Sequence, residues 1–398
     1  MPTGDGLLVR LQPTETISLA AFAALCAAAR RHGNGIIEIT SRGSIQVRGL
    51  SDRSAPDFAA DIAALDIAAA DSVPVLADAL AGIGAEEIFD AGILAADLRR
   101  ALAQRTMAAK LSPKVSVAID GGGAIGLAEI SADIRLYAQA HNGNVALHIA
   151  VGGDAARAVA LGIVALGDGV ETAARLFAVI AQRGREHRAR DIIANEGADV
   201  FQSAIADLLL SAHPRDEREM ASPIGTHALR GGSLACGIGL AFGHSDARSL
   251  GWLVEAAAAA GASGFRAAAG RALIAVGLPP QTAAAFAAAA ENLGFITRAG
   301  DPRRHVIACA GAPVCASAHI ASRALAPLIA GNAECTVHIS GCAKGCAHAA
   351  SAALTIVGTA DGCALVANGS ARDTPFAIVP AGELPAAIAK FVREANHV

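Results

Sequence analysis

Four cysteines near the C-terminus have the spacing of an iron–sulfur ligand set. Cys309 and Cys315 form a C-x5-C pair, and after 26 intervening residues Cys342 and Cys346 form a C-x3-C pair. Gly and Ala surround both pairs, and such small residues let the backbone approach inorganic sulfide and donate N–H groups to it. Four thiolates from two short loops are the donors that a cubane cluster requires. The quartet therefore predicts a redox centre.

Two other roles for these cysteines remain open. A structural zinc site fits poorly, because its cysteine pairs are usually spaced as C-x2-4-C. Disulfides fit poorly as well, because residues 1–5 lack the basic and apolar regions of a secretory signal, and thiols stay reduced in the cytoplasm. We therefore predict a cytoplasmic protein. The remaining cysteines are scattered along the chain: Cys26, Cys236, Cys335 and Cys363.

Composition excludes several classes of function. The chain of 398 residues is 53% hydrophobic, but alanine inflates that value, and we find no uninterrupted apolar run of about 18 to 20 residues that would span a membrane. The net charge of −4 does not favour a polyanionic partner such as DNA. We expect a protein that binds neither nucleic acid nor membrane and has the length for several domains.

A strand–helix–strand–strand pattern occurs twice. The first copy has a strand over residues 7–11, a helix over 19–31 and two strands within 36–50. The second copy has a strand over 238–242, a helix over 247–260 and two strands within 264–278, and its helix begins 228 residues after the first. A longer α/β stretch follows each copy, and the charged segment 184–221 reads as a linker between the halves. The pattern predicts two related halves that pair.

Several motifs in this order resemble the sulfite/nitrite reductase superfamily over nearly the whole chain. They are the Thr40-Ser41-Arg42 turn with Gln46 and Gly49, the segment Leu111-Ser112-Pro113-Lys114, and the two cysteine loops. Within the superfamily, the chain resembles most the precorrin-3B synthases of aerobic cobalamin biosynthesis, through Ile119–Gly123, Pro223–Gly225 and Ala269–Leu273.

The resemblance implies a duplicated α+β fold. In it, two ferredoxin-like half-domains pair around a pseudo-two-fold axis, and two larger α/β lobes are attached to them. We predict half-domains at residues 1–70 and 223–300, a first lobe with its linker at 71–222, and a second lobe that carries the cluster at 301–398.

The resemblance also implies site residues and cofactors. Cys309, Cys315, Cys342 and Cys346 are expected to hold a [4Fe–4S] cluster. By position, Arg10 and Lys114 match cations that bind the reduced anion in the reductases, and Arg42 and Gln46 match groups that bind the carboxylates of sirohaem. Two further reductase cations are missing, because their positions fall at Val73-Pro74 and at Ser116, and Thr14-Glu15 replaces an expected Gly-Gly.

The missing cations favour one activity over another. Reduction of sulfite or nitrite needs concentrated positive charge, and each charged hydrogen bond contributes on the order of 1–3 kcal/mol. A pocket that keeps the macrocycle-binding groups but lacks anion-binding cations suggests that the tetrapyrrole is the substrate. The resemblance then implies a monooxygenase that converts precorrin-3A to precorrin-3B with O₂ and an external electron donor, either an NADH-linked reductase or a ferredoxin-like protein.

Two alternatives and one unknown remain. The alternatives are a sirohaem-dependent sulfite or nitrite reductase and a non-catalytic iron–sulfur or tetrapyrrole carrier. The synthase interpretation also implies a mononuclear non-haem iron, for which a facial set of His and carboxylate ligands is usual. Four histidines lie near the cysteines in sequence, but they form no motif from which ligands follow: His305, His319, His338 and His348.

Overall fold

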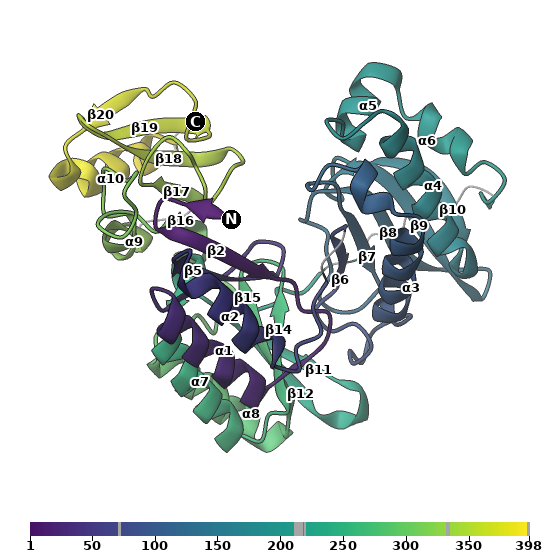
Figure 1. Ribbon diagram of the computed structural model, residues 1–398, viewed down its shortest axis with the longest axis horizontal. Helices are drawn as coiled ribbons and strands as arrows, with labels where there is room; N and C mark the ends of the chain where they lie inside the picture. The colour runs from purple at the N-terminus through teal and green to yellow at the C-terminus, as the bar shows by residue number, and fades with distance from the viewer. Residues whose placement is uncertain (71–72, 211–217, 219, 332–334, 396–398) are drawn as a thin grey trace.

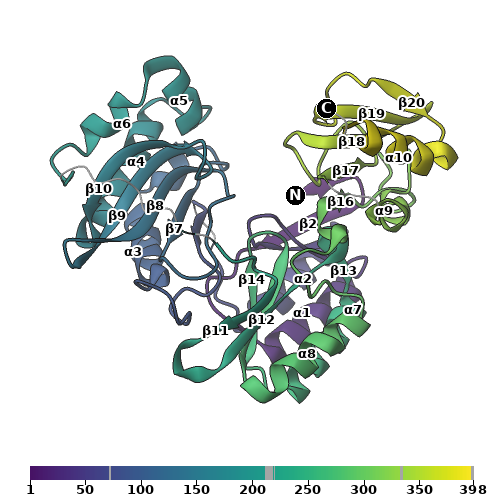
Figure 2. The same cartoon turned by 180° about the vertical axis from the view of Figure 1, so that it is seen from behind.

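The computed structural model describes residues 1–70, 73–210, 218, 220–331 and 335–395. Two α/β lobes stand apart from each other on a central body, as both views show (Figures 1 and 2). The described residues form four five-stranded sheets, two in the central body and one in each lobe. This arrangement is the predicted α+β architecture.

The first sheet of the central body comes mainly from the N-terminal half-domain. Its strands run in the order β1-β2-β5-β4-β13, and helices α1 and α2 follow β3 and β5 in the chain. The bounds are β1 Pro2–Thr3, β2 Gly6–Leu11, β4 Ile36–Ile39, β5 Ile45–Leu50, β13 His244–Asp246, α1 Leu19–His32 and α2 Ser54–Ala63.

The second sheet repeats this plan with the later half-domain, in the order β11-β12-β15-β14-β3. Its bounds are β3 Ile17–Ser18, β11 Gly225–Ala228, β12 Leu234–Gly239, β14 Gly264–Ala268 and β15 Ala272–Leu278. Helices α7 Ala247–Ala259 and α8 Pro280–Asn292 correspond to α1 and α2.

Each half-domain completes the other's sheet. Strand β3 of the first half pairs with β14 of the second, and β13 of the second half pairs with β4 of the first. The last residue of each exchanged strand also caps the helix that follows it. Ser18 accepts a hydrogen bond from the N–H of Ala21 in α1, and Asp246 accepts from two N–H groups at the start of α7. The short segments that pair the two half-domains are therefore the same segments that cap helices α1 and α7.

The two half-domains share one hydrophobic core. Helices α1 and α7 lie side by side (Figures 1 and 2), and the rings of Phe22 and Phe265 are 5.0 Å apart between centroids. Both rings are fully buried. Since this core draws side chains from both halves, neither half can bury its apolar surface alone.

The first α/β lobe has strand order β10-β9-β8-β7-β6. Strands β6, β7 and β8 are parallel, and β9 is antiparallel to both β8 and β10. The strands are β6 Val75–Ala77, β7 Val117–Asp120, β8 Ala132–His141, β9 Asn144–Gly153 and β10 Val159–Ala165. Its helices are α3 Ala91–Gln104, α4 Gly169–Gln182, α5 Ala189–Glu196 and α6 Asp199–Ala204.

The second lobe has the same order and the same strand directions, β16-β17-β18-β19-β20. Its elements are β16 Val306–Ala308, α9 Ser322–Ala330, β17 Val337–Ser340, β18 Ala352–Thr359, β19 Gly362–Gly369, β20 Ala377–Val379 and α10 Leu384–Ala395. The duplication expected from the sequence thus extends to the lobes.

Two local expectations were wrong. The strand expected at 238–242 ends at Gly239, because residues 241–243 form a 3-10 turn in which Phe242 has a positive φ of 62°. The segment read as a linker, 184–221, contains α5 and α6, and Ile192 and Phe201 are buried in the core of the first lobe. Positions 211–217 and 219 of that segment lie outside the described residues.

Among the described residues, no helix has both the length and the apolar character needed to cross a bilayer.

Replacing Phe265 with Ala tests the shared core. Deleting a fully buried phenyl ring costs about 3–5 kcal/mol, so we expect a clear drop in the urea midpoint of the central body. The single Trp of the chain, Trp252, lies on α7 and reports this transition by fluorescence. Ile93→Ala is the control, because that side chain is 62% exposed and should shift the midpoint little. An unchanged midpoint for Phe265→Ala would contradict a shared core.

Candidate functional site

The two cysteine loops lie at the same edge of the second lobe's sheet. Cys309 directly follows β16, and Cys342 lies two residues after the end of β17. These strands are parallel neighbours with Ala308 opposite Ile339, so their carboxyl ends meet at one edge. The sheet topology therefore brings together two pairs that are far apart in sequence.

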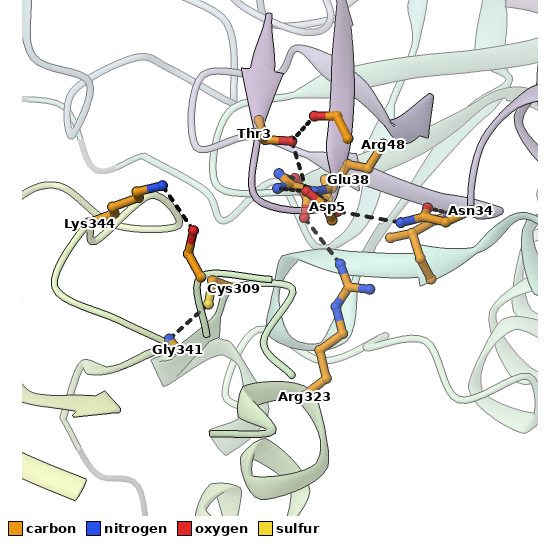
Figure 3. A network of polar contacts seen from close by, with 12 residues as sticks. Thr3, Asp5, Asn34, Glu38, Arg48, Cys309, Arg323, Gly341 and Lys344 are labelled. Carbon is orange, nitrogen blue, oxygen red and sulfur yellow. Dashed lines mark hydrogen bonds and ion pairs between the residues drawn. The ribbon is translucent and has the colours of Figure 1, made fainter. Parts of the chain in front are cut away.

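Backbone and side-chain groups surround Cys309 with hydrogen-bonding partners. The N–H of Gly341 donates to Cys309 Sγ at 3.0 Å, as Figure 3 shows, and Ser322 Oγ lies 3.5 Å from the same sulfur. The pKa of Cys309 is lowered to about 5, chiefly by the hydrogen bond that it shares with Cys346. Backbone N–H donors aimed at a thiolate are characteristic of iron–sulfur ligands.

The N-terminal turn covers the first cysteine loop. Gly4 packs against Cys315 so closely that a Cβ there would overlap the sulfur. The N–H of Ala316 donates to the carbonyl of Gly4 at 2.8 Å. Lys344, which lies in the C-x3-C loop, donates from Nζ to Ser317 Oγ at 3.1 Å and so joins the two loops (Figure 3).

The donor set suits a multi-iron cluster better than a single ion. Within the residues that the structure describes, no group of three or more His, Cys, Asp or Glu side chains converges closely enough to hold one metal ion. Four thiols distributed over two glycine-rich loops, one of them already accepting a backbone N–H, fit a cubane in which each iron takes one thiolate.

A cavity of about 580 Å³ lies where the central body meets both lobes. Cys309 and Cys346 line it from the second lobe, and residues 129–131 line it from the first lobe. From the central body, strands β2, β4 and β5, the turn between β4 and β5 and the turn between β14 and β15 contribute a polar wall: Arg10, Glu38, Arg42, Gln46, Arg48 and Arg271.

Two equivalent hairpin turns dock on each other beside this cavity. Arg42 and Ala269 form an isolated antiparallel bridge, and the N–H of Gly270 donates to the carbonyl of Ser41 at 3.0 Å. Gly43 has a φ of +78°, and a Cβ on it would press against the backbone at Ala268. Glycine is therefore required for the close approach.

The structure brings the four predicted binding residues together. Arg10, Arg42 and Gln46 line the central cavity. Lys114 lines an adjoining cavity of about 440 Å³, and Arg10 and Arg42 line that cavity too. Arg188, which the sequence did not single out, is a further cation there.

Hydrogen bonds fix the orientation of these side chains. Arg42 donates from Nη2 to the carbonyl of Ser131 at 3.0 Å, which connects the central body to the first lobe. In the amide orientation that pairs donors with acceptors, Gln46 accepts from Arg10 Nε at 2.8 Å and donates to Glu38 at 3.0 Å. Burial lowers the pKa of Arg10 and Arg42, because it destabilises the charged guanidinium. An anionic group bound in the cavity would stabilise that charge.

A buried ion network lies next to the cavity and ties the second lobe to the central body (Figure 3). Arg48 contacts Asp5 at 2.7 Å and Glu38 at 3.2 Å, and Arg323 of α9 contacts Glu38 at 3.3 Å. Burial raises the pKa of Glu38 against the opposing effect of Arg48 and Arg323. For Asp5, burial also acts to raise the pKa, but the hydrogen bonds and charge of Arg48 outweigh it, and the net pKa is lowered.

Sequence reasoning missed several residues of this wall. Arg48 lies two positions after Gln46 on β5, so the period-two alternation of a strand could have placed it on the same face. Arg271 has a φ of +63° in the second hairpin turn, a conformation that the sequence does not signal for arginine. Arg188 donates three hydrogen bonds to the carboxylate of Asp133, 55 positions away in the chain, and only the fold reveals that contact.

The two positions that lack reductase cations are buried in the first lobe. Val73 belongs to its hydrophobic core, and Ser116 is fully buried with its N–H donating to Asp133 at 2.9 Å. Neither Val73 nor Ser116 lines the central or the adjoining cavity, but Pro74, the other residue of the first position, lines the adjoining one. The sites of the missing cations therefore carry no charge beside either cavity.

Comparison with known proteins supports this architecture. Residues 1–65 match the nitrite/sulfite reductase ferredoxin-like half domain. A precorrin-3B synthase of a Sinorhizobium species is 38% identical over 400 aligned positions, which cover 99% of this chain and 86% of that protein. The NirA protein of Mycobacterium tuberculosis has the same fold, with a TM-score of 0.77 at 20% identity over 97% of this chain and 80% of that one.

Replacing Asp5 with Asn tests the ion network. The Asp5 side chain is fully buried, and breaking one partner of a buried pair costs about 3–5 kcal/mol. We expect a lower urea midpoint at neutral pH. Because the folded pKa of Asp5 lies below the ordinary 3.8, its contribution is present above that pH and is lost as the pH falls further.

The midpoints of the two proteins should therefore converge in acid. Asp97→Asn is the matched control, since Asp97 is 45% exposed in its pair with Arg100 and should change stability little. A constant difference between wild type and Asp5→Asn down to the lowest pH would show that the carboxylate charge is not the cause.

Proposed function

The chain belongs to the precorrin-3B synthase family, and we propose on this premise that it oxygenates a tetrapyrrole held between its cluster loops and its hairpin turns. The observation that carries the proposal is the central cavity, which is bounded by Cys309 and Cys346 on one side and by Arg10, Arg42 and Gln46 on the other. A redox centre and a polycarboxylate-binding wall thus share one space.

The proposed reaction is precorrin-3A plus O₂, two electrons and two protons giving precorrin-3B plus water. One oxygen atom enters the product, where C20 is hydroxylated and an acetate side chain closes a γ-lactone. The other oxygen atom leaves as water. Both electrons come from an external donor, either an NADH-linked reductase or a ferredoxin-like protein.

We assign the [4Fe–4S] cluster to Cys309, Cys315, Cys342 and Cys346. When bound, the cluster would supply electrons one at a time, and the O₂-activating group would be the mononuclear non-haem iron that the family resemblance implies. The chain's own contribution is to hold the thiolates by the N–H of Gly341 and to cover Cys315 with the turn at Gly4.

Arg10, Arg42, Gln46 and Lys114 are proposed to orient the macrocycle by its carboxylates. The guanidinium of Arg42 is already fixed by Ser131, and that of Arg10 by Gln46, so each is held before substrate arrives. Arginine suits a bidentate grip on carboxylate, and a preorganised donor loses less entropy on binding. The two adjoining cavities give the peripheral carboxylates separate sites around one ring.

A sirohaem-dependent sulfite or nitrite reductase is the alternative on the same scaffold. It would need two cations that this chain lacks, because uncharged residues, Val73-Pro74 and Ser116, stand at their positions. The absorption spectrum of the purified protein separates the two. An intense Soret band from bound sirohaem would refute the synthase proposal, and a broad iron–sulfur shoulder alone agrees with it.

Replacing Cys342 with Ser tests the cluster and the activity together. Protein purified without oxygen, then given reductant, O₂ and precorrin-3A, should yield a product heavier by one oxygen atom in mass spectrometry. We expect Cys342→Ser to lose cluster iron, sulfide and product formation, because each cubane iron needs its thiolate.

Cys335→Ser is the matched control for that experiment, since Cys335 is a thiol outside the two cysteine loops. The control should keep the cluster and the activity. Full cluster content in Cys342→Ser would refute the ligand set, and a wild-type protein that binds precorrin-3A without converting it would favour the carrier alternative.

Replacing Arg42 or Lys114 with Ala tests the macrocycle grip. Loss of one charged hydrogen bond, worth about 1.5–3 kcal/mol, should weaken precorrin-3A binding roughly 10- to 100-fold. Binding is measured without oxygen from the absorption of the tetrapyrrole. Arg157→Ala is the control, because Arg157 is 84% exposed on the first lobe. Wild-type affinity in both cavity variants would exclude these residues from the substrate site.

A further inference from the structure

Arg188 lines the adjoining cavity with a guanidinium that is already fixed from behind. It lies at the start of α5 and donates from Nε and Nη2 to the carboxylate of Asp133 at 2.7 to 3.0 Å. Asp133 is 2% exposed and also accepts the N–H groups of Ser116 and Ala189. Among the described residues, Nη1 of Arg188 has no hydrogen-bond partner. One nitrogen of a rigidly held guanidinium is thus left for a ligand in the cavity.

The adjoining cavity has an excess of positive charge. Among the described residues that line it, none is Asp or Glu and four are cations: Arg10, Arg42, Lys114 and Arg188. Asp133 compensates the charge of Arg188, whereas the hydrogen-bond partners of Arg42 and Arg10 are neutral groups of Ser131 and Gln46. The pKa of Arg42 is lowered first by burial and then by the positive charge of Arg188, so these two guanidiniums lie close enough to repel each other. An anion bound between them would stabilise both charges.

The four cations come from two parts of the molecule. Arg10 on β2 and Arg42 in the turn after β4 belong to the central body, and Lys114 and Arg188 belong to the first lobe. A single carboxylate carries one negative charge and would leave much of the positive charge uncompensated. The cavity volume of about 440 Å³ has room for two short carboxylate chains. The arrangement therefore suits two neighbouring carboxylates, one for each pair of cations.

We propose that Arg188 is a specificity-determining residue, which with Lys114 binds one of two neighbouring carboxylates of a pyrrole ring while Arg10 and Arg42 bind the other. Asp133 is its positioning residue. In an octacarboxylate tetrapyrrole, each pyrrole ring carries an acetate beside a propionate. In the corresponding tetracarboxylate, a methyl group replaces each acetate and would leave cationic donors of the cavity without a partner. The site therefore selects the octacarboxylate, an inference that rests on the proposed function because it requires a tetrapyrrole in this cavity.

The selectivity can be measured without turnover. Cluster-loaded protein is titrated under argon by isothermal titration calorimetry with uroporphyrinogen III, an octacarboxylate, and with coproporphyrinogen III, its tetracarboxylate counterpart. We expect the wild type to bind uroporphyrinogen III at least about tenfold more tightly, which is the effect of one charged hydrogen bond. Arg188→Ala should lower this ratio of affinities by about tenfold and leave the affinity for coproporphyrinogen III unchanged.

The ratio of affinities separates recognition from structure. Arg188→Ala leaves the buried Asp133 without its cation, and a general loss of structure in the first lobe would weaken the binding of both probes alike. Lys114→Ala is therefore a second variant, because Lys114 is exposed and its truncation leaves no buried charge. It should lower the ratio in the same direction. Arg190→Ala is the matched control, since Arg190 lies on the same helix, is 76% exposed and should leave the ratio unchanged.

The outcomes for the inference and for the proposed function differ. Equal affinities of the wild type for the two probes, or no binding of either, would overturn the inference. A wild-type ratio in both Arg188→Ala and Lys114→Ala would overturn it as well, and tetrapyrrole binding would stand. A ratio that depends on Arg188, in a protein that binds precorrin-3A but does not convert it, would instead count against the proposed function and leave the inference standing.

Discussion

The buried contacts among Asp5, Arg48, Glu38 and Arg323 are the joint on which the site depends. They connect the N-terminal turn, the first half-domain sheet and helix α9 of the second lobe (Figure 3). The second lobe meets the central body around β1, β2 and β5 (Figure 1). Charges buried at such a boundary fix one geometry, because any other relative position leaves an ion without its partner. These ion pairs therefore fix the position of the cysteine loops relative to the cavity wall.

The internal duplication gives the cysteine loops a counterpart in the first lobe, where another residue type stands in place of the thiol. Strands β6 and β7 correspond to β16 and β17, so Asp78 occupies the place of Cys309. Asp78 accepts the N–H of Gly121 at 3.2 Å, as Cys309 accepts that of Gly341. Burial, followed by the charge of Asp120, raises the pKa of Asp78 to about 7. The same anion-binding loop thus holds a carboxyl group in one lobe and a thiol in the other.

Long helices and strands were predictable from the sequence, whereas short ones were not. The long amphipathic helices α1 and α7 and the cysteine loops carry strong local signals, and their predicted positions are confirmed within a residue or two. The exchanged strands β3 and β13 have two and three residues, too few for any periodicity, so the reciprocal pairing was not visible. Helices α5 and α6 are similarly short, and their charged surface concealed buried residues such as Phe201.

Some residues of the site could likewise be predicted from sequence motifs, and others only from the folded structure. Arg10, Arg42, Gln46 and Lys114 could be named because they belong to recognisable segments. Arg271 and Arg188 instead depend on a turn and on a contact with Asp133 that only the folded chain defines. The fold also distinguishes the four cysteines. Cys309 and Cys346 line the cavity, whereas Cys315 faces the turn at Gly4. The cavity wall thus meets the cysteine loops at Cys309 and Cys346, and the N-terminal turn, which also carries Asp5 of the ion network, meets them at Cys315.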